Sequence, residues 1–278
     1  MKKTKLLFTF LLLVGFTVSC EEDEYVTSYS DGSVLYERIN DKQAVVNKSL
    51  CVSTNITIPD SIPMGDAKVG VVSINDRAFE GDTKIQNINY SRLISKIGDY
   101  AFAASSLRSF TIKGTVSSIG VGICEDCLSL TNVNIEKGIL SAIPEDAFSV
   151  DWEANTKNSA LNTLIIPEGI KTIGKRAFWR TNAKRIDIPN SVERIEQGAF
   201  CYTGADYITI GTGIKHIGDN AFDRAGAYYI VIYANSVPVI GNEAFNMIYN
   251  PIYVKDELVD AWKKALPFYA DVQPLSSL

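Results

Sequence analysis

The sequence predicts a solenoid of about eight stacked repeats of 22–24 residues, mainly β, with one short helical turn in each coil. Three observations predict this fold. An Ile followed five positions later by Phe recurs along most of the chain, a short stretch of alternating apolar residues follows each pair, and the distance between pairs is nearly constant. A unit of this length cannot bury its own apolar edge, so the units must stack and share one core.

The most regular element is an Ile-x-x-x-Ala-Phe segment, in which an eighth copy, Ile119 to Cys124, carries cysteine in the Phe position. Successive members of this column are separated by 23, 22, 24, 30, 22, 22 and 23 residues. The segment is too short for a stable isolated helix, so we expect a single turn with the Phe in the interior. The seven Phe positions are Phe79, Phe102, Phe148, Phe178, Phe200, Phe222 and Phe245.

A stretch of alternating apolar residues follows most of these turns. Examples are the isoleucine pairs at 186 and 188, 208 and 210, and 230 and 232. Alternation with period two is typical of a strand that buries one face. Pro167 and Pro189 directly follow two of these stretches, and we expect them to end the strand because proline has no amide donor.

This pattern resembles the BspA-like (treponemal-type) leucine-rich repeat, whose consensus runs close to Ile-Gly-x-x-Ala-Phe-x-x-Cys-x-x-Leu-x-x-Ile-x-Ile-Pro. The resemblance covers about residues 70–254, and the departures are Cys124, alanines in the leading Leu column and one 30-residue unit around 149–160. The resemblance implies a leucine-rich repeat solenoid. It also implies non-catalytic binding, as adhesion to host or bacterial surface macromolecules.

The two ends of the repeat region are predicted to act as caps. Residues 33–70 contain alternating segments that favour a β-rich N-terminal cap, and the repeats then run over 71–254. In the C-terminal cap, 255–278, Asp256 is expected to N-cap a helix that covers the edge of the last strand. We expect that helix to present one apolar face made of Leu258, Ala261, Trp262 and Ala265.

The first 19 residues have the profile of a secretory signal: lysines at 2, 3 and 5, and then an apolar run that ends at Ser19. A retained anchor helix is the weaker interpretation. Thr17-Val18-Ser19-Cys20 resembles a bacterial lipobox, which implies lipidation of Cys20 and an outer-membrane lipoprotein that faces the cell exterior. The acidic run at 21–24 opens a predicted tether, 20–32, and either keeps it solvated or resembles a surface-export signal.

Composition disfavours several classes of function. Basic residues number 27 and acidic residues 32, and without the three leader lysines the net charge falls from −5 to −8, so nucleic acid is not an expected partner. The chain has a single histidine, His216, so most acid–base catalysis and metal sites built from several histidines lack the residues they need. The sequence therefore predicts no enzyme, catalytic residue, metal or cofactor.

Two cysteines form a Cys-x-x-Cys pair, Cys124 and Cys127, which elsewhere indicates redox or zinc chemistry. Here Cys124 occupies the Phe column, and Cys127 falls on the cysteine of the resembled consensus. We therefore expect structural cysteines. A disulfide is compatible with an extracytoplasmic location and is not decided by the sequence.

The sequence offers more residues for binding a partner than for catalysis. Strands in register would place their outward residues in columns on one face of a sheet. The C-terminal half of these columns gathers the predicted binding residues Arg185, Asp187, Tyr207, Tyr229 and Tyr253, to which Trp152 in the longer repeat is added. Tyrosine and arginine are enriched at binding hot spots. Tyrosine columns also stabilise exposed sheets without any ligand, so both interpretations stay open, as does the choice between a protein and a glycan partner.

Overall fold

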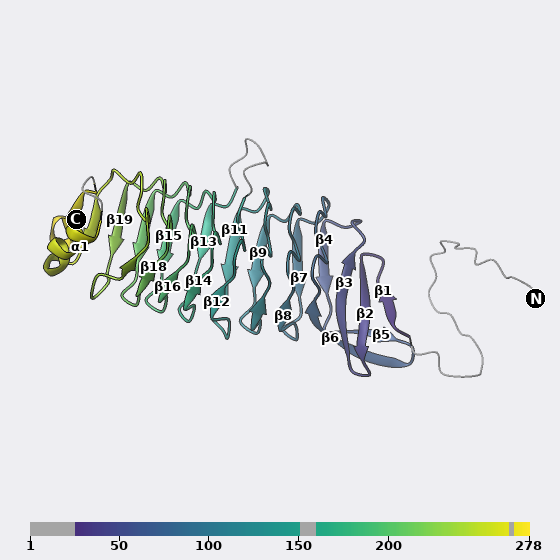
Figure 1. The fold of residues 1–278 in the computed structure, drawn as a ribbon. Helices are drawn as coiled ribbons and strands as arrows, with labels where there is room; N and C mark the ends of the chain where they lie inside the picture. The colour runs from purple at the N-terminus through teal and green to yellow at the C-terminus, as the bar shows by residue number, and fades with distance from the viewer. Residues whose placement is uncertain (1–25, 151–159, 267–269) are drawn as a thin grey trace, which may run out of the picture.

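The computed structural model describes residues 26–150, 160–266 and 270–278. The coils follow one another in a row, with antiparallel strands at the N-terminal end and a short helix at the C-terminal end (Figure 1). The predicted leucine-rich repeat solenoid is confirmed. Among the described residues, no helix is both long enough and apolar enough to cross a bilayer.

The N-terminal strands form a sheet that leads into the coils. β1 pairs antiparallel with β2, β2 with β3, and β5 with β6, whereas β3 pairs parallel with β6. β1 lies within the range predicted as a tether, 20–32, and β6 runs across the predicted boundary between 70 and 71. The bounds are β1 Ser28–Ser30, β2 Val34–Asn40, β3 Gln43–Ser49, β4 Asn55–Ile58, β5 Ser61–Met64 and β6 Ala67–Ile74.

One face of the solenoid is a parallel sheet of eight strands, in the order β22-β21-β19-β17-β15-β13-β11-β9, while β7 pairs with β4 beside it. Arg185 pairs with Tyr207 and Tyr207 with Tyr229, so equivalent residues of successive coils lie side by side. The bounds are β7 Asn87–Tyr90, β9 Ser109–Ile112, β11 Asn132–Ile135, β13 Thr163–Ile165, β15 Arg185–Ile188, β17 Tyr207–Ile210, β19 Tyr229–Ile232, β21 Ile252–Val254 and β22 Val272–Pro274.

A second face carries strands of two residues each. The first two continue the N-terminal sheet, and the last five form a separate parallel sheet. Each ends in a buried or half-buried Ile. The bounds are β8 Lys96–Ile97, β10 Ser118–Ile119, β12 Ala142–Ile143, β14 Thr172–Ile173, β16 Arg194–Ile195, β18 His216–Ile217 and β20 Val239–Ile240.

The third side, here called the turn edge, is formed by the Ile-x-x-x-Ala-Phe segments and the three residues after each. In the described segments the Ile ends a strand and turns follow it, as the expected single turn requires, but without helical backbone. Residues two positions before and after the Phe have left-handed φ, as at Arg176 (52°) and Arg180 (58°). As a result every second amide points along the stack, and Arg176, Phe178 and Arg180 donate to carbonyls of the next coil at 2.9, 2.9 and 3.0 Å.

The phenylalanines of the column stack on one another inside the coils. Centroids of Phe178 and Phe200 lie 5.3 Å apart with 10° between the ring planes, and Phe200 lies 5.4 Å from Phe222 at 7°. Cys124 interrupts the stack between Phe102 and Phe148. All seven phenylalanines of the column, and Cys124 itself, are buried. The column therefore fixes the distance and the register between coils.

The C-terminal segment differs from its prediction. A 3₁₀ turn, η1 (Asp256–Leu258), leads into α1 (Val259–Ala265), and η2 (Leu275–Ser277) follows β22. The side chain of Asp256 does not cap the helix: its Oδ1 accepts a hydrogen bond from the Ser276 amide at 3.0 Å. The edge of β21 is paired by β22 and not covered by the helix.

The expected apolar face of this helix is only partly correct. Trp262 is fully buried and Leu258 packs against the core, whereas Ala261 and Ala265 are exposed. The helix has only seven residues, or about two turns, and the single buried side chain of Trp262 attaches it to the core. Trp262 is thus a structural anchor.

We expect Phe200→Ala to lower the free energy of unfolding by about 3–5 kcal/mol, because it removes a buried ring and opens a cavity between two stacked neighbours. Equilibrium urea unfolding measures the change. Tyr249→Ala, at a side chain that is 65% exposed, is the control and should cost far less. A loss below about 1 kcal/mol for Phe200→Ala would contradict the stacked core.

Candidate partner-binding surface

Five tyrosines gather on the long-stranded sheet near its C-terminal end, over β17, β19 and β21. This surface, here called the tyrosine face, consists of Tyr207, Tyr228, Tyr229, Tyr233 and Tyr253. Tyr228 and Tyr233 directly flank β19, and the other three lie within strands. The alternation of the strands sends Ile208, Ile230 and Ile252 into the core and leaves the tyrosines outside.

The rings of the tyrosine face contact one another across coils. The centroid of Tyr207 lies 4.9 Å from that of Tyr229 and 6.0 Å from that of Tyr228, and Tyr229 meets Tyr253 edge-on at 5.9 Å. Tyr228 is 63% exposed, while Tyr229 and Tyr253 are half-buried. Four of the five rings therefore form one connected aromatic surface, and the rings of Tyr207 and Tyr229 are each held between two neighbours.

Arg185 and Asp187 lie beside the tyrosine face on β15 and pair with each other. Arg185 Nε donates to Asp187 Oδ2 at 2.6 Å, and Thr209 Oγ1 donates to Asp187 Oδ1 at 2.7 Å. Partial burial by itself would raise the pKa of Asp187, but the hydrogen bonds from Arg185 and Thr209 lower it below its usual value. The pair therefore stays charged at neutral pH and is lost only when acid protonates the carboxylate.

The structure brings together five of the six predicted binding residues. The strand register places Arg185, Tyr207 and Tyr229 side by side in one column. Tyr253 pairs with Val231 and so belongs to the neighbouring column. Val231 falls on the outward side of β19 by alternation with Tyr229, but it is only 2% exposed. Trp152 and Cys20 lie outside the described residues.

Sequence reasoning missed Tyr228 and Tyr233. Tyr233 continues the outward alternation of Tyr229 and Val231 one residue past the strand, so the pattern could have found it. Tyr228 breaks the alternation, since it stands next to Tyr229 and is nevertheless exposed. Its position follows from the start of β19 at Tyr229, which periodicity does not locate.

Comparison with protein families finds a match to the BspA type leucine-rich repeat region, in six copies over residues 49–155 and 154–250. The chain belongs to the BspA-type leucine-rich repeat family. Members of this family are cell-surface proteins and generally bind other molecules without catalysing reactions. A comparison with curated proteins found no match.

Solved structures of bacterial leucine-rich repeat proteins resemble this BspA-type chain in fold. The T. pallidum leucine-rich repeat protein is 19% identical, with a TM-score of 0.53 over 87% of this chain and 99% of that one. A leucine-rich cell surface protein from Faecalibacterium prausnitzii is 22% identical, with a TM-score of 0.44 over 78% and 73%. The pneumococcal vaccine antigen PcpA is 15% identical, with a TM-score of 0.37 over 89% and 98%.

The cysteines of this BspA-type chain are free thiols at the described positions. Cys124, Cys127 and Cys201 are buried, and Cys51 is exposed. The thiol of Cys127 donates to the Phe102 carbonyl oxygen at 2.9 Å. Burial raises the pKa of Cys124, and burial together with the nearby Asp223 raises the pKa of Cys201 to about 11. Within the described ranges, no group of three His, Cys, Asp or Glu side chains is arranged to hold a metal.

We expect one fast-reacting thiol, Cys51, when native protein carrying Cys20→Ser is treated with a disulfide reagent near pH 8. The three buried thiols are shielded, and a raised pKa keeps Cys124 and Cys201 protonated at that pH. Four thiols should react once the protein is unfolded. Cys51→Ser is the control that removes the fast reaction. A second fast thiol in the native protein, or fewer than four after unfolding without reductant, would contradict this assignment.

Proposed function

We propose that this chain is a lipid-anchored, outward-facing binding protein of the bacterial outer membrane, which adheres through its tyrosine face to macromolecules on host or bacterial surfaces. The observation that carries the proposal is the tyrosine face itself. Four of its five rings, from three adjacent coils, contact one another, and Tyr207, Tyr228 and Tyr233 are between 39% and 63% exposed. Tyrosine is enriched at binding hot spots, where ring and hydroxyl act together.

The dimensions and charge of this surface favour a macromolecular ligand. Neighbouring strands lie about 4.8 Å apart, so β15 to β21 extends the surface over roughly 15 Å. The Arg185–Asp187 pair cancels its own charge, so contact depends on aromatic area and hydroxyl groups. Binding through this face should therefore weaken little as salt is raised within the physiological range.

The anchor is proposed from Cys20 and the residues before it. Each buried methylene of an acyl chain adds about 0.8 kcal/mol of membrane affinity, so several chains on one cysteine hold a protein firmly. The acidic residues at 21–24 stand directly after this cysteine, as in the export signal that they resemble. The tyrosine face lies near the C-terminal end of the solenoid, away from β1 to β3 at the N-terminal end (Figure 1), so an anchor before β1 would attach at the opposite end from this face.

Two other functions remain as candidates. A glycan-binding accessory lipoprotein for polysaccharide uptake is favoured by the tyrosine rings, because an aromatic face stacks on a sugar ring. A scaffold within the envelope, with no extracellular ligand, is compatible with an exposed sheet whose tyrosines only stabilise cross-strand pairing. The two experiments below separate these from the adhesin.

We expect the double variant Tyr207→Ala, Tyr229→Ala to bind isolated host-cell and bacterial surface fractions at least about 30-fold more weakly than wild type, since two hot-spot residues cost about 2 kcal/mol or more. Binding is measured by biolayer interferometry against the same fractions after protease or glycosidase treatment. Val239→Ala is the control, because Val239 is 67% exposed on the opposite sheet.

The treatments assign the class of ligand in this experiment. Protease-sensitive binding that requires the tyrosines supports the adhesin with a protein ligand, and glycosidase-sensitive binding that requires them favours the glycan-binding function. Binding that the double variant retains in full would refute the role of the tyrosine face.

We expect externally added proteinase to digest the protein on intact cells while a periplasmic marker survives. We expect Cys20→Ala to leave the membrane fraction, because it removes the acylated residue. Immunoblots of fractionated cells measure both results. Protection of the wild-type protein on intact cells would contradict the outward-facing adhesin and favour the envelope scaffold.

A further inference from the structure

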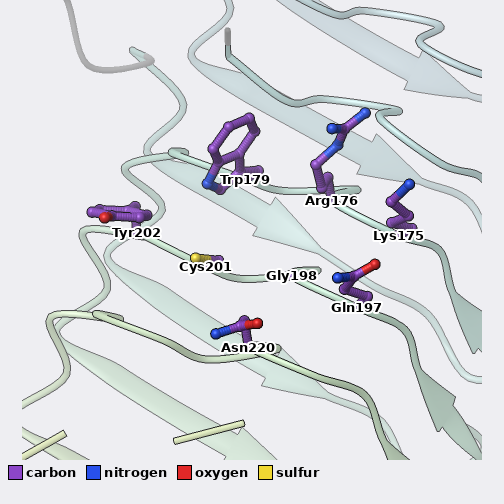
Figure 2. Close-up of a pocket in the computed structure, with 8 residues that line it drawn as sticks. All are labelled: Lys175, Arg176, Trp179, Gln197, Gly198, Cys201, Tyr202 and Asn220. Atoms are coloured by element: carbon purple, nitrogen blue, oxygen red, sulfur yellow. The ribbon is translucent and has the colours of Figure 1, made fainter. Parts of the chain in front are cut away.

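A hollow of about 200 Å³ lies on the turn edge, on a different side of the solenoid from the tyrosine face. It spans the segments around Phe178, Phe200 and Phe222. Figure 2 shows Trp179 on the first of these coils, Gly198, Cys201 and Tyr202 on the next, and Asn220 on the third. It is smaller than the roughly 300–1,000 Å³ of pockets for drug-sized ligands, so it suits a single ring.

The hollow exists because Gly198 has no side chain. Gly198 occupies the left-handed position two residues before the Phe, which the adjacent coils fill with Arg176 and Asn220. The other glycine of this column, Gly122, is covered, since the Tyr100 ring lies 2.4 Å from where its Cβ would be. At Gly198 the nearest atom to such a Cβ is Arg176 Cγ at 3.5 Å, so the space above it stays open.

The aromatic side chains around this space are held by neighbours. The indole N–H of Trp179 faces the Cys201 sulfur. The Arg176 guanidinium lies 5.7 Å from the Trp179 ring centroid, and the Arg224 guanidinium lies 5.2 Å from that of Tyr202. Trp179 is half-buried and Tyr202 is 36% exposed, so both rings present apolar area to the hollow and to solvent.

The charges at the rim are already paired. Arg176 makes two hydrogen bonds to Asp146, at 2.8 and 2.6 Å, and Lys175 Nζ lies 3.1 Å from Glu145 Oε1. The remaining polar lining is supplied by the side-chain amides of Gln197 and Asn220, which can donate and accept hydrogen bonds; Asn220 Nδ2 already donates one, to Glu243 Oε2 at 3.3 Å. The two cations that line the hollow, Lys175 and Arg176, therefore already have acidic partners, whereas a ligand with several hydroxyl groups finds matching amides.

We infer that this hollow is a binding site for one neutral sugar ring, which would lie against Trp179 and Tyr202 and exchange hydrogen bonds with Gln197 and Asn220. An aromatic face suits the apolar C–H face of a pyranose, and amides suit its hydroxyl groups. The site shares no residue with the tyrosine face and does not rest on the proposed adhesive function. The proposal for the hollow and the proposal for the tyrosine face can therefore be confirmed or refuted independently.

Saturation-transfer NMR on the purified full chain tests this site with glucose, galactose, mannose, N-acetylglucosamine and glucuronate as probes. We expect transfer to at least one neutral sugar, together with a change in tryptophan fluorescence. Trp179→Ala should weaken that binding at least tenfold. Gly198→Asn should do the same by filling the hollow, and its backbone is suited to the site because Asn220 adopts the same left-handed φ, 54°, one coil away.

Two controls keep the test specific. Tyr100→Ala removes an aromatic ring from the position that Gly198 occupies in its own coil, and it should leave sugar binding unchanged. The double variant Tyr207→Ala, Tyr229→Ala should also leave sugar binding unchanged. Thermal unfolding of Gly198→Asn close to that of wild type confirms that this variant folds. The inference is overturned if no neutral sugar binds, if Gly198→Asn retains full binding, or if glucuronate is preferred.

Discussion

Register between coils is the constraint on which the rest of this structure depends. Two interactions set it together: the ring-on-ring stacking of the Phe column inside, and the hydrogen bonds that every second residue of the turn edge donates to the next coil outside. The second interaction requires left-handed φ at non-glycine residues such as Arg176 and Asn220, a conformation that costs an L-residue about 1–2 kcal/mol. Stacking and hydrogen bonding across the coil interface offset that cost.

Fixed register turns residues that are distant in sequence into neighbours. Tyr207 and Tyr229 are 22 residues apart and share one ring contact, and Trp179 and Tyr202 border one hollow from successive coils. The tyrosine face is an added column of side chains on a regular sheet. The hollow has the opposite origin, because one side chain is missing from a column that is otherwise filled. A repeat array can thus create binding surfaces by a few substitutions while the core stays unchanged.

Periodicity was sufficient to predict the solenoid, the buried Phe column and the outward columns that contain Arg185, Tyr207 and Tyr229. It was not sufficient where position depends on a neighbouring coil. The turn edge was expected to hold one short helical turn per coil, yet every second amide there donates to the next coil. The pairing of β22 with β21 and the open space at Gly198 likewise depend on contacts that no spacing rule contains. Tyr228 was not predicted as part of the tyrosine face, because the alternation of residues does not show at which residue a strand begins.

The central claim is that the tyrosine face, and not the opposite sheet, contacts an external partner. Photo-crosslinking on living cells tests it most directly, with p-benzoylphenylalanine placed at position 207 or at position 239, both exposed and on different sheets. Contact through the tyrosine face predicts discrete higher-mass adducts from position 207 and none from position 239. Equal adducts from both positions, or adducts from 239 alone, would contradict the claim.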